Sequence, residues 1–311
     1  MRTLLLITLG GAIAQLVDGS LGMGFGATST TLLITLAAMT PASASAVVHV
    51  AELGTTAASG LSHWKFGNVD WKVALQLGIP GAAGAFLGAT VLSNLTLNAA
   101  KPVTSTILLL IGLSLIIRFS RGRRTTTSTQ PPASRRSLTT LGLFGGFVDA
   151  AGGGGWGPVT SSTLMSIGKT EPRRIVGTVN TAEFLVTLAA SLGFILGLWS
   201  ELVEHFSAVL ALLTGGVIAA PFAAWLVSRI NATALGGFVG TTLVLLNLST
   251  ILKLLPALEP WTLPIYLTVA TLGITLSALG VRRSRALANT PPTSYSEQLP
   301  SPEKSPAGST H

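Results

Sequence analysis

The sequence predicts an all-helical protein that crosses the membrane many times and consists of two copies of one unit. Of the 311 residues, 48% are hydrophobic and only 10% are charged, far below the roughly 25% of a soluble domain. A carboxylate followed by glycines at alternate positions also occurs twice, each time between apolar runs. Because one spanning helix needs about 20 apolar residues, the apolar runs amount to about 8 to 10 membrane segments.

The repeated motif begins at Asp18 in the first copy and at Asp149 in the second, a shift of 131 positions (149 − 18). Shared composition would match Gly and Leu freely, but it would not match Asp, Pro and Glu in one register. The same ungapped shift aligns the identical pairs Gly22 and Gly153, Gly24 and Gly155, Gly26 and Gly157, Pro41 and Pro172, and Glu52 and Glu183. The chain therefore contains an internal duplication, and we expect each copy to supply half of one site.

Composition and charge also exclude several classes of function. The net charge of +8 comes from basic residues placed between and after the apolar runs, where they orient membrane helices, so we do not expect nucleic-acid binding. Cysteine is absent, which excludes disulfides, thiolate metal sites and a thiol nucleophile. The chain has no His-Glu-x-x-His zinc pattern and no Gly-x-Ser-x-Gly nucleophile turn. We therefore expect neither an enzyme nor a cofactor.

The glycine-rich stretches are predicted to interrupt their helices. Each glycine in a helix interior costs about 1 kcal/mol relative to alanine, so alternate glycines favour a broken helix or a re-entrant pair of half-helices in each copy. Broken helices paired across two repeats indicate the binding site of a transporter. The alternative is close packing of helices through small residues. The predicted substrate-binding residues are the glycines Gly22, Gly24, Gly26, Gly153, Gly155 and Gly157 and the neighbouring hydroxyl residues Thr28, Ser29, Thr160 and Ser161.

A second group of candidates is ionisable or polar and lies within apolar runs. His49 and Glu52, at i and i+3, share one face of the helix that begins at Pro41. Ionisable residues inside a membrane are functional candidates. Alternatively, such a pair holds neighbouring helices together. The predicted coupling residues are Asp18, His49, Glu52, Asp149, Asn180 and Glu183.

Basic residues also define the organisation of the chain. We expect two membrane repeats, 1–118 and 138–285, a basic linker at 119–137, and a Pro- and Ser-rich disordered tail at 286–311. A cytoplasmic linker and tail leave only Arg2, Lys101 and Lys253 on the outer side. Counting the segments then predicts that the two copies are inverted relative to each other, as in alternating-access transporters. We expect the last helix, 260–281, to stop at its arginine cluster.

Five motifs occur in order along the chain: Gln15 to Gly26, Ser45 to Glu52, Ser62 to Asp70, Gly155 to Pro158, and Gly177 to Glu183. Together they resemble the sulfite exporter TauE/SafE family, also called the 4-toluenesulfonate uptake permeases. The resemblance extends over residues 4 to 281 and leaves out the linker and the tail. It implies transport of a sulfur-containing oxyanion, such as sulfite or an organosulfonate, across the bacterial cytoplasmic membrane.

Physical chemistry gives the same site a mechanism. An oxyanion that leaves water needs replacement donors, which backbone N–H groups at glycine breaks and helix N-termini supply. Nearby carboxylates repel an anion unless they are protonated or paired, so we expect protons to be the coupling ion. His49 is suited to share such a proton with Glu52, whereas Asn180 is not. The alternative function is a cation or metal-ion permease or channel that uses the intramembrane carboxylates.

Overall fold

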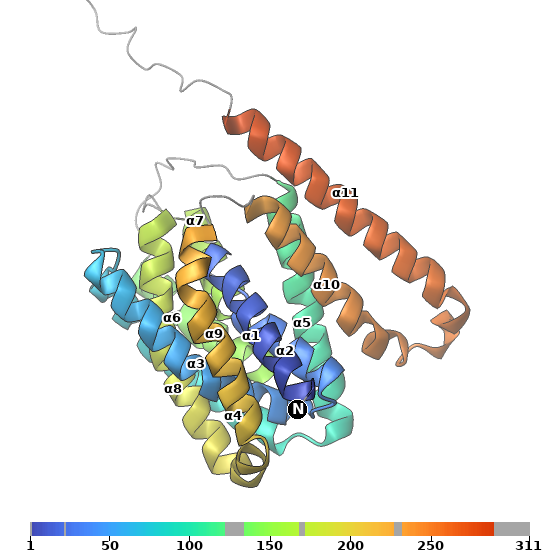
Figure 1. The fold of residues 1–311 in the computed structure, drawn as a ribbon, viewed down its shortest axis with the longest axis horizontal. Coiled ribbons are helices and arrows are strands. Elements are labelled where there is room, and N and C mark those ends of the chain that lie inside the picture. The colour runs from blue at the N-terminus through green and yellow to red at the C-terminus, as the bar shows by residue number, and fades with distance from the viewer. Residues whose placement is uncertain (1, 22, 122–133, 168–171, 227–231, 289–311) are drawn as a thin grey trace, which may run out of the picture.

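The structure, a computed structural model, describes residues 2–21, 23–121, 134–167, 172–226 and 232–288. All regular secondary structure in these ranges is helical (Figure 1). In chain order the elements are α1 (Arg2–Leu21), α2 (Phe25–Leu36), α3 (Pro41–Lys65), α4 (Trp71–Asn94), α5 (Leu97–Ser120), α6 (Arg135–Gly152), α7 (Trp156–Ile167), α8 (Pro172–Glu204), α9 (Phe206–Leu226), α10 (Ala232–Leu252), the short 3₁₀ helix η1 (Pro256–Trp261) and α11 (Thr262–Ala288).

The order of the helices repeats with the sequence. Adding the shift of 131 to α2, residues 25–36, gives 156–167, which are the bounds of α7. The helices α1, α3, α4 and α5 correspond in the same way to α6, α8, α9 and α10. Their ends differ by at most four residues, except that α8 continues eight residues past the shifted end of α3. Among the described elements, η1 and α11 have no counterpart. The duplication read from the sequence is therefore also a duplication of structure.

The two copies pack against each other through pairs of contacts in which equivalent helices take each other's place. Helix α4 lies along α6, and its counterpart α9 lies along α1, while α3 packs on α8 and α5 on α10. A β-carbon on Gly84 would lie 2.0 Å from the carbonyl oxygen of Leu143, and one on Gly215, the equivalent position, 2.0 Å from that of Thr8. Glycine is needed at both positions because the backbones approach so closely. The bundle therefore has an approximate two-fold arrangement.

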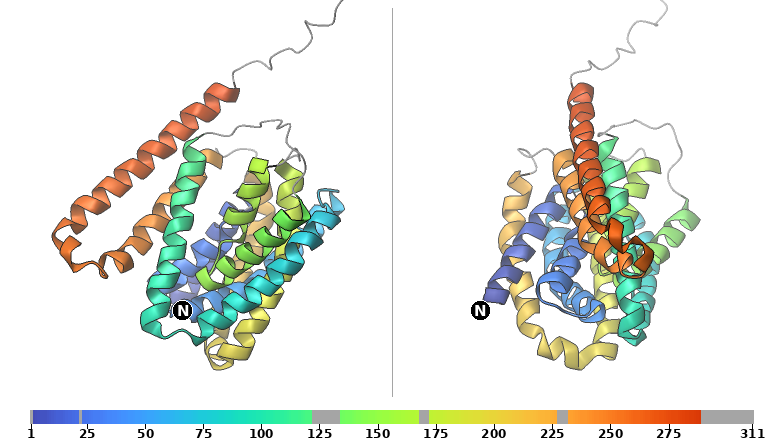
Figure 2. Two further views of the ribbon diagram at one scale, coloured as in Figure 1. Left: turned by 180° about the vertical axis from the view of Figure 1, so that it is seen from behind. Right: turned by 90° about the vertical axis from the view of Figure 1, so that its right-hand side faces the viewer.

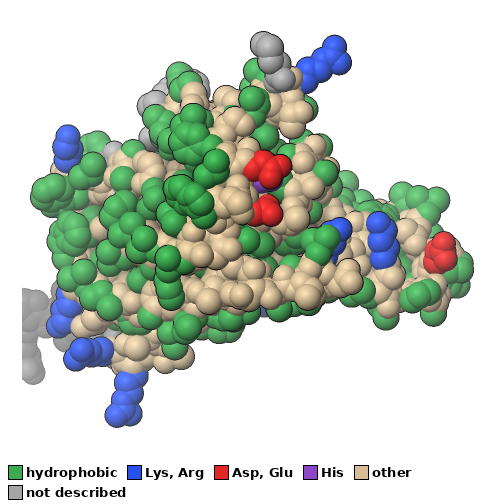
Figure 3. Space-filling view, turned by 90° about the horizontal axis from the view of Figure 1, so that it is seen from below, with side chains coloured by type: hydrophobic (Ala, Val, Ile, Leu, Met, Phe, Trp, Pro, Cys, Tyr) green, Lys and Arg blue, Asp and Glu red, His purple; other side chains and the backbone are tan. Residues whose placement is uncertain are grey.

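Several helices suit a membrane environment. Within the described residues, four are long and apolar enough to cross a bilayer: Trp71–Asn94, Leu97–Ser120, Arg174–Glu204 and Pro256–Ala286. Many large hydrophobic side chains are also exposed, and the face shown in Figure 3 carries them among polar groups and backbone, with few charged side chains. A soluble monomer rarely exposes so much apolar surface. The chain is a multi-pass membrane protein.

The last helix lies on the outside of the bundle, against α10 and α5 (Figures 1 and 2). The prediction that this helix stops at the arginine cluster is wrong, because α11 continues to Ala288. Arginine is a good helix former, so a run of arginines ends the apolar surface without ending the helix. Arg283 also donates to the carbonyl oxygen of Ser120 at 2.9 Å, which ties this end of α11 to the end of α5. Residues 122–133 of the predicted linker and 289–311 of the predicted tail lie outside the described residues.

Candidate functional site

The first glycine-rich stretch separates α1 from α2. Gly24 has φ +114°, in the left-handed region that favours glycine, and the helix resumes at Phe25. Asp18, in the last turn of α1, lies beside the backbone N–H of Phe25. A carboxylate at this point satisfies an N–H group that has no partner inside α2, and it lies at the positive end of the helix dipole.

The second glycine-rich stretch has the same arrangement, and its carboxylate makes more hydrogen bonds. Gly153 and Gly154 have φ +72° and +137° and separate α6 from α7. Asp149 Oδ1 accepts the backbone N–H groups of Gly155 at 2.7 Å and Trp156 at 2.8 Å. In each copy the carboxylate that begins the motif therefore lies at the N-terminus of the second half-helix, and Asp149 caps it.

The two breaks lie in direct contact. A β-carbon on Gly26 would lie 2.8 Å from Gly154 Cα, and one on Gly154 would lie 2.0 Å from the backbone nitrogen of Ala27. The hydroxyl of Thr30 donates to the carbonyl oxygen of Gly153. The backbones of the two glycine-rich breaks are therefore in direct contact, and no larger residue fits at Gly154.

His49 connects α3 to the second break. Its ring is fully buried, with Nδ1 2.8 Å from the carbonyl oxygen of Ser45 and Nε2 3.3 Å from Asp149 Oδ2. The equivalent residue, Asn180, instead donates to Ser59 Oγ at 3.1 Å. The hydrogen bonds of His49 thus go to Ser45 and Asp149, and not to Glu52 as the i, i+3 spacing suggested.

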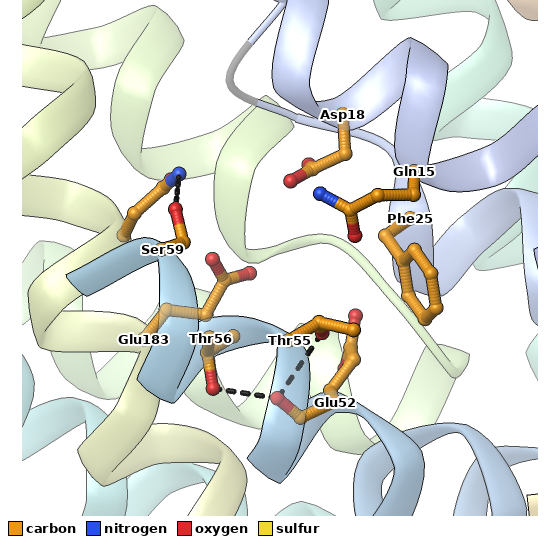
Figure 4. Close-up of a pocket in the computed structure, with 9 residues that line it drawn as sticks. Gln15, Asp18, Phe25, Glu52, Thr55, Thr56, Ser59 and Glu183 are labelled. Carbon is orange, nitrogen blue, oxygen red and sulfur yellow. Dashed lines mark hydrogen bonds between the residues drawn. The ribbon is translucent and has the colours of Figure 1, made fainter. Parts of the chain in front are cut away.

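The other three carboxylates of the predicted site meet at one pocket between α1, α3 and α8 (Figure 4). Asp18, Glu52 and Glu183 turn toward it from three different helices, and a β-carbon on Gly26 would lie 3.2 Å from Glu52 Oε1. The pocket is narrow, with free space for about one water molecule. Its lining consists of Gln15, Asp18, Phe25, Glu52, Thr55, Thr56, Ser59, Asn180 and Glu183.

A scan against protein families decides what kind of protein carries this site. The model described as sulfite exporter TauE/SafE matches residues 7–250. The chain belongs to the TauE/SafE family.

Two relatives of this TauE/SafE protein come from Bacillus subtilis strain 168. It is 46% identical to the probable membrane transporter protein YtnM over 255 residues, which cover 81% of this chain and 84% of the relative. It is 26% identical to the probable membrane transporter protein YdhB over 225 residues, covering 70% of this chain and 89% of the relative. No solved structure matches the chain at a significant level.

The predicted hydroxyl residues of this TauE/SafE protein differ in their surroundings. Thr28 Oγ1 and Ser29 Oγ on α2 are buried and have no hydrogen-bond partner among the described residues. In the second copy, Thr160 donates to the carbonyl oxygen of Trp156 in its own helix at 2.5 Å, and Ser161 is fully buried. Of these four hydroxyl groups, only those of Thr28 and Ser29 lack a partner in the described part of the chain, and none of the four residues lines the pocket described above.

The predicted glycines are also divided. Gly24 and Gly153 form the breaks, and Gly26 touches the opposite break. Gly155 donates its N–H to Asp149, and Gly157 is buried in α7. Gly22 lies outside the described residues.

Sequence reasoning missed several pocket residues that spacing could have found. Gln15 precedes Asp18 by three positions, and Thr55, Thr56 and Ser59 follow Glu52 by three, four and seven. These are the spacings of one helix face, so each lies beside a carboxylate that was recognised. Among the described residues, no group of three or more His, Asp or Glu side chains is arranged to hold a metal ion.

Proposed function

We propose that this protein is a secondary transporter that moves a small sulfur-containing oxyanion, sulfite or an organosulfonate, in exchange for or together with protons. One observation carries the proposal. Three carboxylates, Asp18, Glu52 and Glu183, converge from both repeats on one pocket beside the crossing of two broken helices. In secondary transporters the substrate usually binds near the bilayer midplane, where broken helices of the two repeats meet.

The substrate is recognised at the first break. Thr28 and Ser29 offer hydroxyl groups that have no partner within the described protein, and glycine backbone at this point allows close approach of an anion. The N–H groups of Gly155 and Trp156 are already used by Asp149. The second break therefore contributes shape and backbone at Gly153 and Gly154, and the first contributes the free donors.

Protons control the charge of the pocket. Three carboxylates around a space for about one water molecule cannot all be ionised without strong mutual repulsion. Protonation of Glu52 or Glu183 lowers the negative potential and admits the anion, and release of the proton expels it. His49, which faces Asp149, keeps that fourth carboxylate paired throughout the cycle.

We also infer that the two repeats are inverted in the membrane. The basic residues of the chain favour a cytoplasmic linker and tail, with only Arg2, Lys101 and Lys253 outside. An odd number of crossings between equivalent points then reverses the second repeat. Inversion gives two equivalent ways to open the central pocket, one on each side of the membrane.

A second candidate is a cation permease, because three carboxylates around one pocket attract cations. The two functions differ in the sign of the charge moved. An inward gradient of Na⁺ or a divalent ion across proteoliposomes would drive a current for a cation permease. A transporter of the proposed kind would give no current without a sulfur oxyanion.

Counterflow in proteoliposomes tests the proposal. Vesicles are loaded with unlabelled sulfite, sulfate, thiosulfate or a small sulfonate, and uptake of the corresponding ³⁵S-labelled anion is followed. We expect transient accumulation for sulfite or a sulfonate and none for chloride-loaded vesicles. Equal uptake into protein-free vesicles, or no accumulation with any of the four anions, would contradict the proposal.

A further inference from the structure

Two polar contacts join the repeats at opposite ends of the α3–α8 pair. At one end, Ser43 Oγ in the first turn of α3 donates to Glu201 Oε2 near the end of α8 at 2.5 Å. At the other end, Arg174 Nη2 in the first turn of α8 lies 3.8 Å from Asp70 Oδ2, just beyond the end of α3. In each case the first turn of one long helix is tied to a residue near or just beyond the C-terminal end of the other.

These are the same contact made twice, with the repeats exchanged. Adding the shift of 131 to Ser43 gives position 174, and adding it to Asp70 gives position 201. Both acidic residues also follow a departure from helical backbone at equivalent positions, although the two conformations differ. Gly67, two residues after the end of α3, has φ +68° and precedes Asp70 by three residues; Leu198, with φ −137° and ψ 35°, precedes Glu201 by three. The exchange of contacts is therefore a property of the architecture and not of one loop.

Each contact is supported by its surroundings. Thr40 Oγ1 accepts the backbone N–H of Ser43 at 3.1 Å and lies 2.7 Å from its hydroxyl, which orients that hydroxyl toward Glu201. At the other end, Asp70 caps α4 by accepting the N–H of Val73, and its own N–H donates to Thr178 Oγ1 at 2.9 Å. Both ends of the α3–α8 pair are thus held closed in the same structure.

The pocket lies between the two contacts. Glu52 on α3 and Glu183 on α8 line it from the helices that the contacts hold together. Its free space, about one water molecule, is too small for a sulfur oxyanion, which has at least four heavy atoms. Admission of such an ion requires α3 and α8 to separate at one end.

We propose that Ser43–Glu201 and Asp70–Arg174 are the two gates of the transport cycle and that they open in alternation. This inference rests on the proposed transport function and deepens it. With the orientation given by the basic residues, Ser43–Glu201 closes the outer side and Asp70–Arg174 the cytoplasmic side. The gates differ in strength. The cytoplasmic one is a long, solvent-exposed ion pair that salt weakens, and the outer one is a short, part-buried hydrogen bond to a carboxylate.

The first test measures access to the pocket from each side. Since the chain has no cysteine, Thr55→Cys places a single reporter thiol in the pocket. An impermeant maleimide is applied to vesicles of each orientation. Adding Glu201→Ala should speed labelling from the outer side about tenfold, the effect of losing one hydrogen bond to a charged group. Adding Asp70→Asn, which keeps a cap for α4, should speed labelling from the cytoplasmic side by about twofold to fivefold.

Matched controls use neighbouring charges that make neither contact. Glu204→Ala lies three residues after Glu201, and Lys72→Ala lies two residues after Asp70. Both should leave the sidedness of labelling unchanged. Labelling that rises equally from both sides in the gate variants, or that rises as much in the controls, would overturn the assignment of gates.

The second test locks each gate. The pairs Ser43→Cys with Glu201→Cys and Asp70→Cys with Arg174→Cys are cross-linked by a short bifunctional thiol reagent, and exchange of labelled sulfite is measured before and after reduction. Each lock should abolish exchange, and reduction should restore it. Unchanged exchange in both locked proteins overturns the gates even if the protein transports sulfite. Sided labelling without flux of any sulfur anion would instead refute the proposed substrate and leave the gates standing.

Discussion

The two glycine-rich breaks have the same architecture but use their carboxylates differently. Asp149 accepts two backbone N–H groups and faces the ring of His49 at 3.3 Å, so both of its oxygens are occupied. Asp18 lies beside the N–H of Phe25 and faces the central pocket. Asp149 is therefore fixed in place, whereas Asp18 is available to a proton or a ligand.

The residues around the carboxylates show how this difference arose from one duplicated unit. Trp156 is fully buried, and its indole N–H donates to the carbonyl oxygen of Val179 at 3.1 Å, while the equivalent Phe25 lines the pocket. His49 approaches Asp149, while its equivalent Asn180 turns to Ser59. The two copies share one plan, and a few different residues hold Asp149 in place while Asp18 faces the pocket.

The largest effect should come from removing the fixed carboxylate. Asp149→Ala leaves two N–H groups and a buried histidine without their partner, and loss of one member of a buried ion pair typically costs about 3 to 5 kcal/mol. We expect little folded protein. Asp18→Ala should instead give folded protein that lacks proton-driven transport. Thermal unfolding of both variants in detergent measures the difference. Equal destabilisation would contradict the division of roles.

An intermediate effect should follow from making the first copy resemble the second. His49→Asn shortens the side chain and removes its contact with Asp149, which we expect to destabilise the protein by about 1.5 to 3 kcal/mol, the range for a hydrogen bond to a charged group. The control is His205→Asn, the same change at the partly exposed turn between α8 and α9. The comparison is sharpened if only His49→Asn lowers the unfolding temperature. A neutral His49→Asn would mean that the His49–Asp149 contact has no structural role.

The smallest effect should come from the contact between the breaks. Thr30→Val keeps the side-chain shape but removes the hydroxyl that donates to Gly153, at a cost of about 1 kcal/mol. Thr35→Val removes a hydroxyl that donates only to carbonyls of its own helix, which should be close to neutral. Parallel thermal melts of the two variants provide the measurement, and a larger loss in Thr35→Val is the contrary outcome.

Much of this arrangement could be predicted from the sequence because it has a local cause. Alternate glycines predict the two breaks, and one shift aligns the half-helices α2 and α7 as well as Glu52 with Glu183. The contacts between the copies have no such signal. Gly154 touches Ala27, and His49 touches Asp149, across separations that no periodicity describes.

The same limit applies to the division of roles. The sequence presents Asp18 and Asp149 as equivalent, and only the packing of α3 and α6 shows that one has a histidine partner. The kink at Leu198 is marked only in part by the sequence. Gly197 directly precedes it, but Gly193 lies in unbroken helix, so a glycine alone does not place the kink.

The most direct test of the central claim compares two modes of transport in the same proteoliposomes. Glu52→Gln imitates a permanently protonated carboxylate in the pocket, so it should still bind anion and exchange labelled for unlabelled sulfite. It should lose net uptake driven by a pH gradient, with Glu183→Gln giving the same or a milder defect. If exchange and gradient-driven uptake fall together, or if neither changes, these carboxylates hold helices together and do not couple transport to protons.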